Sequence, residues 1–315
     1  MKKIVYITLP VLLVLFFASC NGEENTPVLQ EESLEISFRV DNFLKNDVST
    51  RATRATDPGT TAEQQIDNVF LFLFDENGAN PIKYFITPTP SAGGSLKVAD
   101  KKVTVNVQPN IAGKRLVHLV ANCADLQADL NGVTTVAGLN NIIRTTAQPW
   151  GSNLTTPLLM YGAATALHDF EANRTLDHVT LTRTVAKLEL NITLTDQRQK
   201  RPLSGGVAQY QYQLVNFDTK TYLIKPVTKP ATPASSEWNA WDAAGTVTSY
   251  TLTNEKVTAL KLVTYLNEID VEGTALKLKI PFGGLLPPPE TVEEVYPLDL
   301  PKILRNHWYT YDIEI

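Results

Sequence analysis

Hydrophobic and polar residues alternate along much of this chain, which is the pattern of a β-strand with one buried face. The alternating segments are residues 34–40, 103–107, 188–194, 209–214, 276–280 and 309–315. In the first segment the apolar positions are Leu34, Ile36, Phe38 and Val40. The pattern predicts many short strands that each turn one face to a core.

Two other segments are almost continuously apolar. They are Val69–Phe74 and Leu116–Ala121, and only His118 interrupts the second. Such runs predict central strands that are covered on both faces. One helix is predicted over Val136–Thr146, where the apolar residues share a face.

The strands are short and separated by turns, which favours a β-sandwich architecture. An irregular stretch over residues 145–173 precedes a predicted long strand, Val179–Leu194. We therefore place a domain boundary near residue 180. The predicted domains are residues 61–179 and 180–315.

The beginning of the chain predicts a lipoprotein signal peptide over residues 1–19. Two lysines precede an apolar run, Ile4–Phe17, that is too short to span a membrane and ends in Ala18-Ser19-Cys20. This arrangement predicts lipidation (palmitate included) at Cys20 and anchoring to the bacterial outer membrane. The alternative is a plain secreted protein with a stray cysteine.

Acidic residues follow directly, at Glu23 and Glu24. They resemble the surface-export signal of Bacteroidetes lipoproteins, and the alternative is a simple polar tether. Residues 20–60 are predicted to hold this tether, the first strand and a protease-sensitive segment.

The charge balance argues against nucleic acid as a partner. The chain has 28 Lys and Arg against 33 Asp and Glu, and loss of residues 1–19 removes two lysines, which shifts the net charge from −5 to −7. An acidic chain without a basic stripe is a poor nucleic-acid binder.

The sequence contains no catalytic motif, so we predict a non-enzymatic protein without metal or cofactor. The histidines, which lack metal-ligand spacing, are His118, His168, His178 and His307. With Cys20 acylated, Cys123 is alone and is predicted to be a small buried hydrophobe. Because carboxylates are abundant, a hydrolase that uses a pair of them stays open as an alternative hypothesis.

Trp238 and Trp241 follow a loop rich in proline and serine. If exposed, they could stack on sugar rings and make the protein a glycan-binding surface lipoprotein. The alternative is that they close one end of a sandwich.

Four motifs together are similar to the fimbrillin family of Bacteroidia type V pili, which includes shaft subunits and fimbrial anchor lipoproteins. They are Ile66–Asp75, Pro157–Gly162, Leu181–Leu188 and Arg305–Tyr309. The resemblance implies an all-β fold with two tandem transthyretin-like, Greek-key β-sandwich domains and one or two short helices. It also implies a fimbrial location and assembly with other fimbrial subunits by strand exchange.

In the shaft subunits of that family, an arginine-specific protease removes the N-terminal strand and opens a groove for a neighbour's strand. The resemblance assigns the role of displaced strand to Leu34, Ile36, Phe38 and Val40. The bonds Arg51-Ala52 and Arg54-Ala55 lie in a small, polar stretch where proteases cut readily. The alternative is that both arginines lie in an ordinary solvated linker.

Shaft subunits of this family generally continue beyond the Arg-Asn-His strand, whereas this sequence stops at Ile315. This feature favours a terminal role such as a base anchor. Base anchors need not be cleaved, however, so the sequence leaves the shaft and terminal roles both open.

Overall fold

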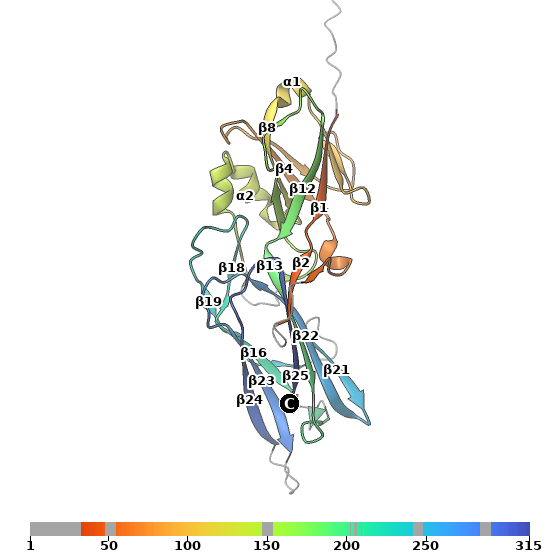
Figure 1. Ribbon diagram of the computed structural model, residues 1–315, viewed down its shortest axis with the longest axis vertical. Coiled ribbons are helices and arrows are strands. Elements are labelled where there is room, and N and C mark those ends of the chain that lie inside the picture. The colour runs from red at the N-terminus through yellow and green to blue at the C-terminus, as the bar shows by residue number, and fades with distance from the viewer. Residues whose placement is uncertain are drawn as a thin grey trace, which may run out of the picture. The chain divides into compact units, whose positions relative to one another are not determined.

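The computed structural model describes residues 33–47, 55–146, 154–201, 203–204, 207–208, 210–241, 248–283 and 291–315. In this part of the chain most residues lie in strands and the helices are few and short (Figure 1), which confirms the predicted all-β class. The buried hydrophobic residues form three clusters. The first contains residues between 34 and 185, the second contains residues between 70 and 159 together with Leu223, and the third contains residues between 186 and 311.

The first sheet has nine strands in the order β5-β4-β8-β10-β12-β1-β7-β6, with β11 paired to β8. Its two end strands, β5 and β6, contact each other, so the sheet curls around its core. The strands are β1 (Ser33–Val40), β4 (Val69–Phe74), β5 (Ile82–Ile86), β6 (Gly94–Lys97), β7 (Lys102–Asn106), β8 (Lys114–Ala121), β10 (Met160–Ala163), β11 (His168–Asp169) and β12 (Thr175–Arg183).

Strand β4 is buried at every position, as predicted for a strand covered on both faces. Val69, Leu71 and Leu73 face the core that the curled sheet encloses. The three phenylalanines between and after them face a second cluster on the outer side, together with residues of η2 (Ala124–Leu126), α2 (Gln127–Gly132) and η3 (Val136–Asn141). Strand β8 pairs with β4 along its length, which confirms the second central strand.

The predicted helix over 136–146 is only partly right. It begins at Val136, but it is a 3-10 helix that ends at Asn141, and Ile143–Thr145 form strand β9. The strand β9 pairs with β18 (Lys220–Tyr222), a segment that is distant in the sequence. This pairing overrides the local helical pattern.

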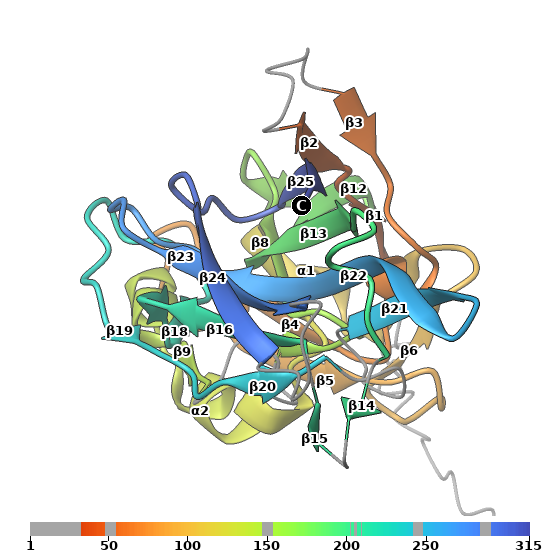
Figure 2. The same cartoon turned by 90° about the horizontal axis from the view of Figure 1, so that it is seen from below.

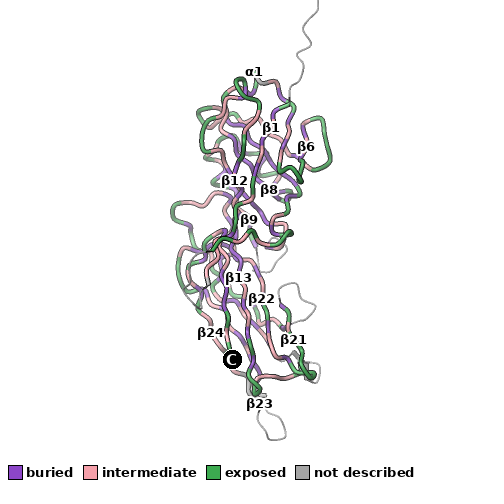
Figure 3. Tube along the Cα trace, turned by 45° about the vertical axis from the view of Figure 1, so that its right-hand side comes forward, coloured by how far each residue is buried: buried purple, intermediate pink, exposed green. Residues whose placement is uncertain are grey.

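Two further sheets enclose the third cluster (Figure 2). One has the order β21-β22-β13-β25-β2-β3 and the other β20-β16-β23-β24. The strands are β2 (Phe43–Asp47), β3 (Ala55–Asp57), β13 (Val185–Thr193), β16 (Gln211–Val215), β20 (Asn239–Ala240), β21 (Thr248–Thr253), β22 (Lys256–Asn267), β23 (Ala275–Gly283), β24 (Thr291–Asp299) and β25 (His307–Glu314). Figure 3 shows that exposed residues gather along the edge strand β21, whereas β13 is largely buried.

The predicted strand 179–194 is two strands. It breaks at Thr184, where β12 of the first sheet ends and β13 of the second begins. The buried Thr184 donates its amide and its hydroxyl hydrogen to the Leu159 carbonyl. The alternating pattern of polar and apolar residues therefore continues across two strands that belong to different sheets.

The remaining elements are short. They are η1 (Ala62–Gln64), α1 (Pro109–Ala112), β14 (Leu203–Ser204), β15 (Val207–Ala208), β17 (Phe217–Asp218) and β19 (Pro233–Ala234).

Candidate functional site

Strand β1 lies inside the first sheet and is paired on both sides. It runs parallel to β12 and antiparallel to β7. Leu34, Ile36 and Phe38 are at most 3% exposed and belong to the core, and Val40 packs against it. The strand thus fills a slot whose walls are two other strands and whose floor is apolar.

The opposite face of β1 is polar. Glu35 accepts a hydrogen bond from Lys102 on β7 at 2.8 Å, and this bond raises the pKa of the lysine. Both side chains are partly exposed, so solvent screens the pair. Burial of the apolar face, rather than this ion pair, holds β1 in place.

Strand β2 continues the same segment into a different sheet. It pairs in parallel with β25, with Leu44 opposite His307, and antiparallel with β3. Among the described strands, β3 pairs with β2 alone. The short stretch from Ser33 to Asp47 therefore contributes one strand to each of two sheets.

Arg183 lies where the segment passes from one sheet to the other. It is fully buried and donates to the carbonyl of Asp41 (2.6 Å), the carbonyls of Pro58 and Glu63 (both 3.0 Å) and Oδ1 of Asn306 (3.0 Å). Burial lowers the pKa of its guanidinium to about 10, and Glu63 and Asp41 partly offset this effect. The arginine remains charged at neutral pH and ties four distant parts of the chain together.

Glu63 supplies the negative charge beside Arg183. Its carboxylate accepts from Lys187 (2.8 Å), the Tyr265 hydroxyl (2.7 Å) and the Thr60 amide (2.6 Å). Burial alone would raise the pKa of Glu63, but these three donors together hold it below its usual value. The carboxylate is thereby kept ionised beside two buried cations.

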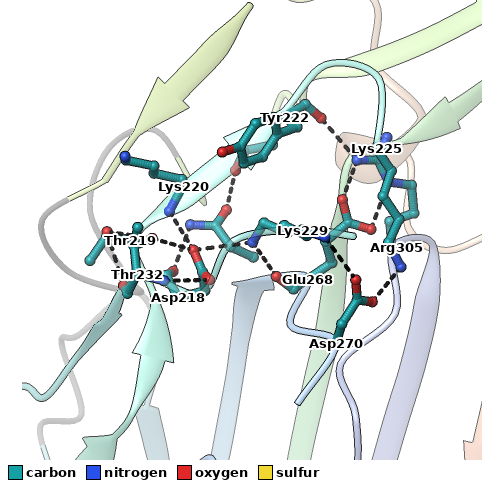
Figure 4. A network of polar contacts seen from close by, with 12 residues as sticks. Asp218, Thr219, Lys220, Tyr222, Lys225, Lys229, Thr232, Glu268, Asp270 and Arg305 are labelled. Carbon is teal, nitrogen blue, oxygen red and sulfur yellow. Dashed lines mark hydrogen bonds and ion pairs between the residues drawn. The ribbon is translucent and has the colours of Figure 1, made fainter. Parts of the chain in front are cut away.

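A second buried polar network lies near β17 and β18 (Figure 4). Asp218 and Lys229 form an ion pair at 3.1 Å, and both side chains are at most 1% exposed. Burial lowers the pKa of Lys229 against the attraction of Asp218. Asp218 also accepts from the Lys220 amide and the Thr232 hydroxyl, so its oxygens are taken up within the protein.

The same network includes the carboxylates of Glu268 and Asp270, which are each paired with a cation. Glu268 pairs with Arg305, which also donates to the carbonyls of Tyr222 and Leu223. Asp270 pairs with Lys225, whose hydrogen bond lowers the pKa of the aspartate (Figure 4). These carboxylates fasten a loop to the end of β22 and are bound by cations rather than directed into a cleft.

Several predicted site residues lie outside the described residues: Cys20, Arg51, Ala52 and Arg54. Ala55, the last residue of the predicted cleavage stretch, is exposed and begins β3. Lipidation and cleavage at these positions stay predictions.

Trp241 is buried in a core, which agrees with the alternative interpretation of the two tryptophans and not with a sugar-stacking surface. This residue is 4% exposed, its ring meets Tyr212 edge-on at 5.6 Å, and its Nε1 donates to the Ser249 carbonyl. Trp238 is only partly buried, and the Lys279 ammonium lies 5.5 Å from its ring centre.

Other polar groups that the sequence singled out are structural. Cys123 is fully buried, as predicted, and burial raises its pKa to about 12. His118 is buried beside Tyr161, with 2.7 Å between Nδ1 and the hydroxyl, and burial lowers its pKa to about 4. In the described ranges no three His, Cys, Asp or Glu side chains are grouped so that they could hold a metal.

No helix in the part of the chain that the structure describes is long and apolar enough to cross a membrane.

Sequence reasoning assigned no role to Arg183, Lys187, Asn306 or Trp308, although all four lie in the motifs that suggested the family. The available signal was a charged residue within an otherwise apolar strand, as at Lys187. Such a residue has to be paired if it is buried.

Profiles of known protein families match both halves of this chain. Residues 34–196 match the profile of the Major fimbrial subunit protein (FimA) family, and residues 184–314 match that of the Minor fimbrium tip subunit MfA4, C-terminal. The Minor fimbrium tip subunit MfA4 of Porphyromonas gingivalis is 41% identical over 337 aligned positions, which cover 100% of this chain and 99% of the relative. The chain therefore belongs to the MfA4 family of fimbrial subunits, which confirms the resemblance seen in the sequence.

Solved structures show the same fold at low sequence identity. The tip fimbrial protein Mfa3 of Porphyromonas gingivalis, with a C-terminal truncation, has a TM-score of 0.51 and 13% identity, over 89% of this chain and 94% of that one. A candidate cell adhesion protein of Bacteroides eggerthii has a TM-score of 0.53 and 16% identity, over 90% and 86% of the two chains.

Proposed function

We propose that this protein is a structural, non-enzymatic subunit of a fimbrium that accepts a strand from another subunit in place of β1. The observation that carries the proposal is the position of β1, which is paired on both sides and buries three apolar side chains in the core. Its loss would leave an apolar slot between two unpaired strand edges. Such a slot is a template for strand addition.

The proposed removal of β1 requires a cut in the chain between β2 and β3, at Arg51-Ala52 or Arg54-Ala55. A cut there would separate both β1 and β2 from the rest of the chain. The β3 strand, which follows the cut, is exposed at Ala55 and Thr56. A protease therefore has an accessible approach from the C-terminal side of the site.

The N-terminal sequence supports export as a lipoprotein that is held by Cys20 on the outer membrane. If the chain is cut at Arg51 or Arg54, the lipid leaves with the first strand and served export only. If it is not cut, Cys20 remains the anchor. Cys20→Ala is expected to abolish labelling by palmitate and to remove the protein from the outer-membrane fraction.

The position in the fimbrium that we propose is the tip or another terminal site. The support is the 41% identity to a protein described as a minor fimbrium tip subunit. A subunit at the end of a fimbrium has to accept a strand from its neighbour, which agrees with the slot that β1 fills.

A glycan-binding role rests on Trp238 alone, since Trp241 is part of the core. Glycan-array binding that is lost in Trp238→Ala and kept in Trp241→Phe would support it. Equal binding by both variants would exclude Trp238 as the contact.

Limited digestion with an arginine-specific protease tests strand acceptance. We expect one trim, mapped by N-terminal sequencing to Ala52 or Ala55, and then uptake of an added peptide that carries residues 33–47. The double variant Arg51→Ala, Arg54→Ala should resist this trim. Arg39 is an internal control, because it lies within a paired strand and should not be cut. A trimmed protein that takes up no peptide would overturn the proposal.

A further inference from the structure

Four residues from three regions of the chain surround the ring of Phe43, the first residue of β2. Arg183 ends β12, Lys187 lies in β13, Trp308 lies in β25, and Gly59 follows β3. We call these four residues the Phe43 cage. Phe43 itself is fully buried within it.

The cage contacts the ring through positive charge and an aromatic neighbour. The Arg183 guanidinium lies 4.0 Å from the ring centre of Phe43, and the Lys187 ammonium lies 6.0 Å from it. The Trp308 ring meets Phe43 nearly edge-on at 6.2 Å and is itself 3.6 Å from the Lys187 ammonium. A cation over the face of an aromatic ring is attracted by the ring quadrupole, and the attraction is strongest when both are desolvated.

Gly59 closes the cage from the remaining side. A Cβ atom at this position would lie 2.8 Å from a ring carbon of Phe43, and the backbone has a φ of +78°. Both the close approach and the positive φ favour glycine here. The cage is therefore shaped for a flat ring that extends to the main chain of Gly59.

Hydrogen bonds also hold the backbone on either side of Phe43. The Asn306 side-chain Nδ2 donates to the Asn42 carbonyl at 2.7 Å, and the Asn306 backbone carbonyl accepts from the Leu44 backbone amide at 3.0 Å. Arg183 donates to the Asp41 carbonyl at 2.6 Å. These contacts select an extended segment but do not depend on its side chains.

The cage lies entirely in the part of the chain that follows the proposed cut. Removal of the segment before Arg51 or Arg54 would take away Phe43 and leave Arg183, Lys187, Trp308 and Gly59 behind. Two cations, at 0% and 4% exposed in the complete chain, would then lack the ring that covers them. An aliphatic side chain could fill the volume, but it could not replace the negative face of the ring.

We propose that the Phe43 cage is a recognition site for an aromatic side chain on the incoming strand of a partner subunit. This inference rests on the proposed strand exchange and adds a requirement to it. The partner is an extended segment with alternating apolar residues that places an aromatic ring at the position of Phe43. The cage thereby fixes the register of the incoming strand, since a shift by one residue would turn the ring to the other face.

The test compares peptides on one receptor, the full chain trimmed in place by an arginine-specific protease. A fluorescent peptide of residues 33–47 replaces the excised segment, and variants compete with it. We expect Phe43→Leu, and cyclohexylalanine in place of Phe43, each to weaken binding about tenfold, because both lose the cation–ring attraction. The matched control is Phe38→Leu, which changes a core ring that none of the described cations contacts, and it should weaken binding by no more than about threefold.

Each outcome decides one of the two proposals. Equal losses for Phe43→Leu and Phe38→Leu, or full affinity with cyclohexylalanine, would overturn the aromatic requirement and leave strand exchange standing. If the unchanged peptide does not bind, strand exchange fails and the inference falls with it. The uncut chain gives a separate readout of the cage, where Phe43→Leu should lower the Tm by about 3 °C more than Phe38→Leu does.

Discussion

At the scale of single residues, buried charge marks the places where distant segments of this chain meet. Arg183 and Asp41 are 142 positions apart, and Arg183 and Asn306 are 123 apart, yet they are joined by hydrogen bonds. A buried charged group persists only when its hydrogen-bonding capacity is filled. The geometry around Arg183 is therefore more demanding than that of an apolar contact.

Arg183→Met is expected to lower the free energy of unfolding by at least about 3 kcal/mol, because it leaves several buried acceptors without a donor. Urea denaturation would measure the loss. Arg39→Met is the control, since Arg39 is exposed and makes a single side-chain bond to Thr180, and it should change stability by less than about 0.5 kcal/mol. Equal effects of the two variants would contradict the role of Arg183.

His118 should make stability depend on pH between about 4 and 6.5. The unfolded chain binds a proton at this histidine near pH 6.5, whereas the folded chain binds it only near pH 4. Stability should thus fall as the pH falls through this window, by up to about 3 kcal/mol. Urea denaturation from pH 4 to pH 7 should show a flatter profile for His118→Gln. An unchanged profile in that variant would show that another group is responsible.

At the scale of elements, β1 and β2 are consecutive strands with different surroundings. The first lies between two strands of its sheet, and the second lies between the C-terminal strand β25 and the short β3. Apolar burial holds β1, whereas hydrogen bonds from Asn306 and the cage hold β2. One segment therefore contributes strands to two sheets, while its buried apolar residues, Phe43 included, belong to a single cluster.

Ile36→Ala should destabilise the uncut chain by about 2–4 kcal/mol, because the side chain is fully buried in β1. Ser37→Ala, on the other face of the same strand, should have an effect of less than about 0.5 kcal/mol. After trimming and removal of the excised segment, both variants should bind an added unmodified peptide with wild-type affinity. A defect that persists at that stage would place the effect of Ile36 outside β1.

At the scale of the whole described chain, the N-terminal segment is a shared part of two sheets. Loss of residues up to the proposed cut would open β7 and β12 in one sheet and β3 and β25 in the other. The strands β4 and β23 keep all their pairing partners. Trimming should thus remove a pairing partner from strands in both sheets.

Hydrogen exchange read by mass spectrometry, before and after trimming, should show this division. We expect faster exchange in β7, β12, β3 and β25, because their backbone groups lose partners, and unchanged exchange in β4 and β23. Addition of a peptide of residues 33–47 should restore the slow exchange. Faster exchange that spreads evenly over all strands would instead indicate global loosening.

Much of the fold could be predicted because strand patterns are local. The alternation at Leu34–Val40 and the continuous run at Val69–Phe74 correspond to β1 and β4. The helix over 136–146 was predicted too long because β9 is set by its pairing with β18, which no local pattern encodes. The sequence left the burial of Trp241 open for the same reason, since its contact with Tyr212 depends on how β16 and its neighbours pack.

The sequence by itself determined the all-β class, the strands with one or two buried faces, the inertness of Cys123 and the fimbrial family. These follow from the period of the side chains and from short motifs, which are properties of neighbouring residues. Only the tertiary structure decided that Thr184 divides two sheets, that β1 and β2 belong to different sheets, and that Arg183, Lys187 and Trp308 meet at Phe43. The physical reason is that strand pairing and the burial of charge depend on partners more than a hundred residues away. A local pattern indicates that a strand or a buried charge needs a partner, but it does not identify that partner.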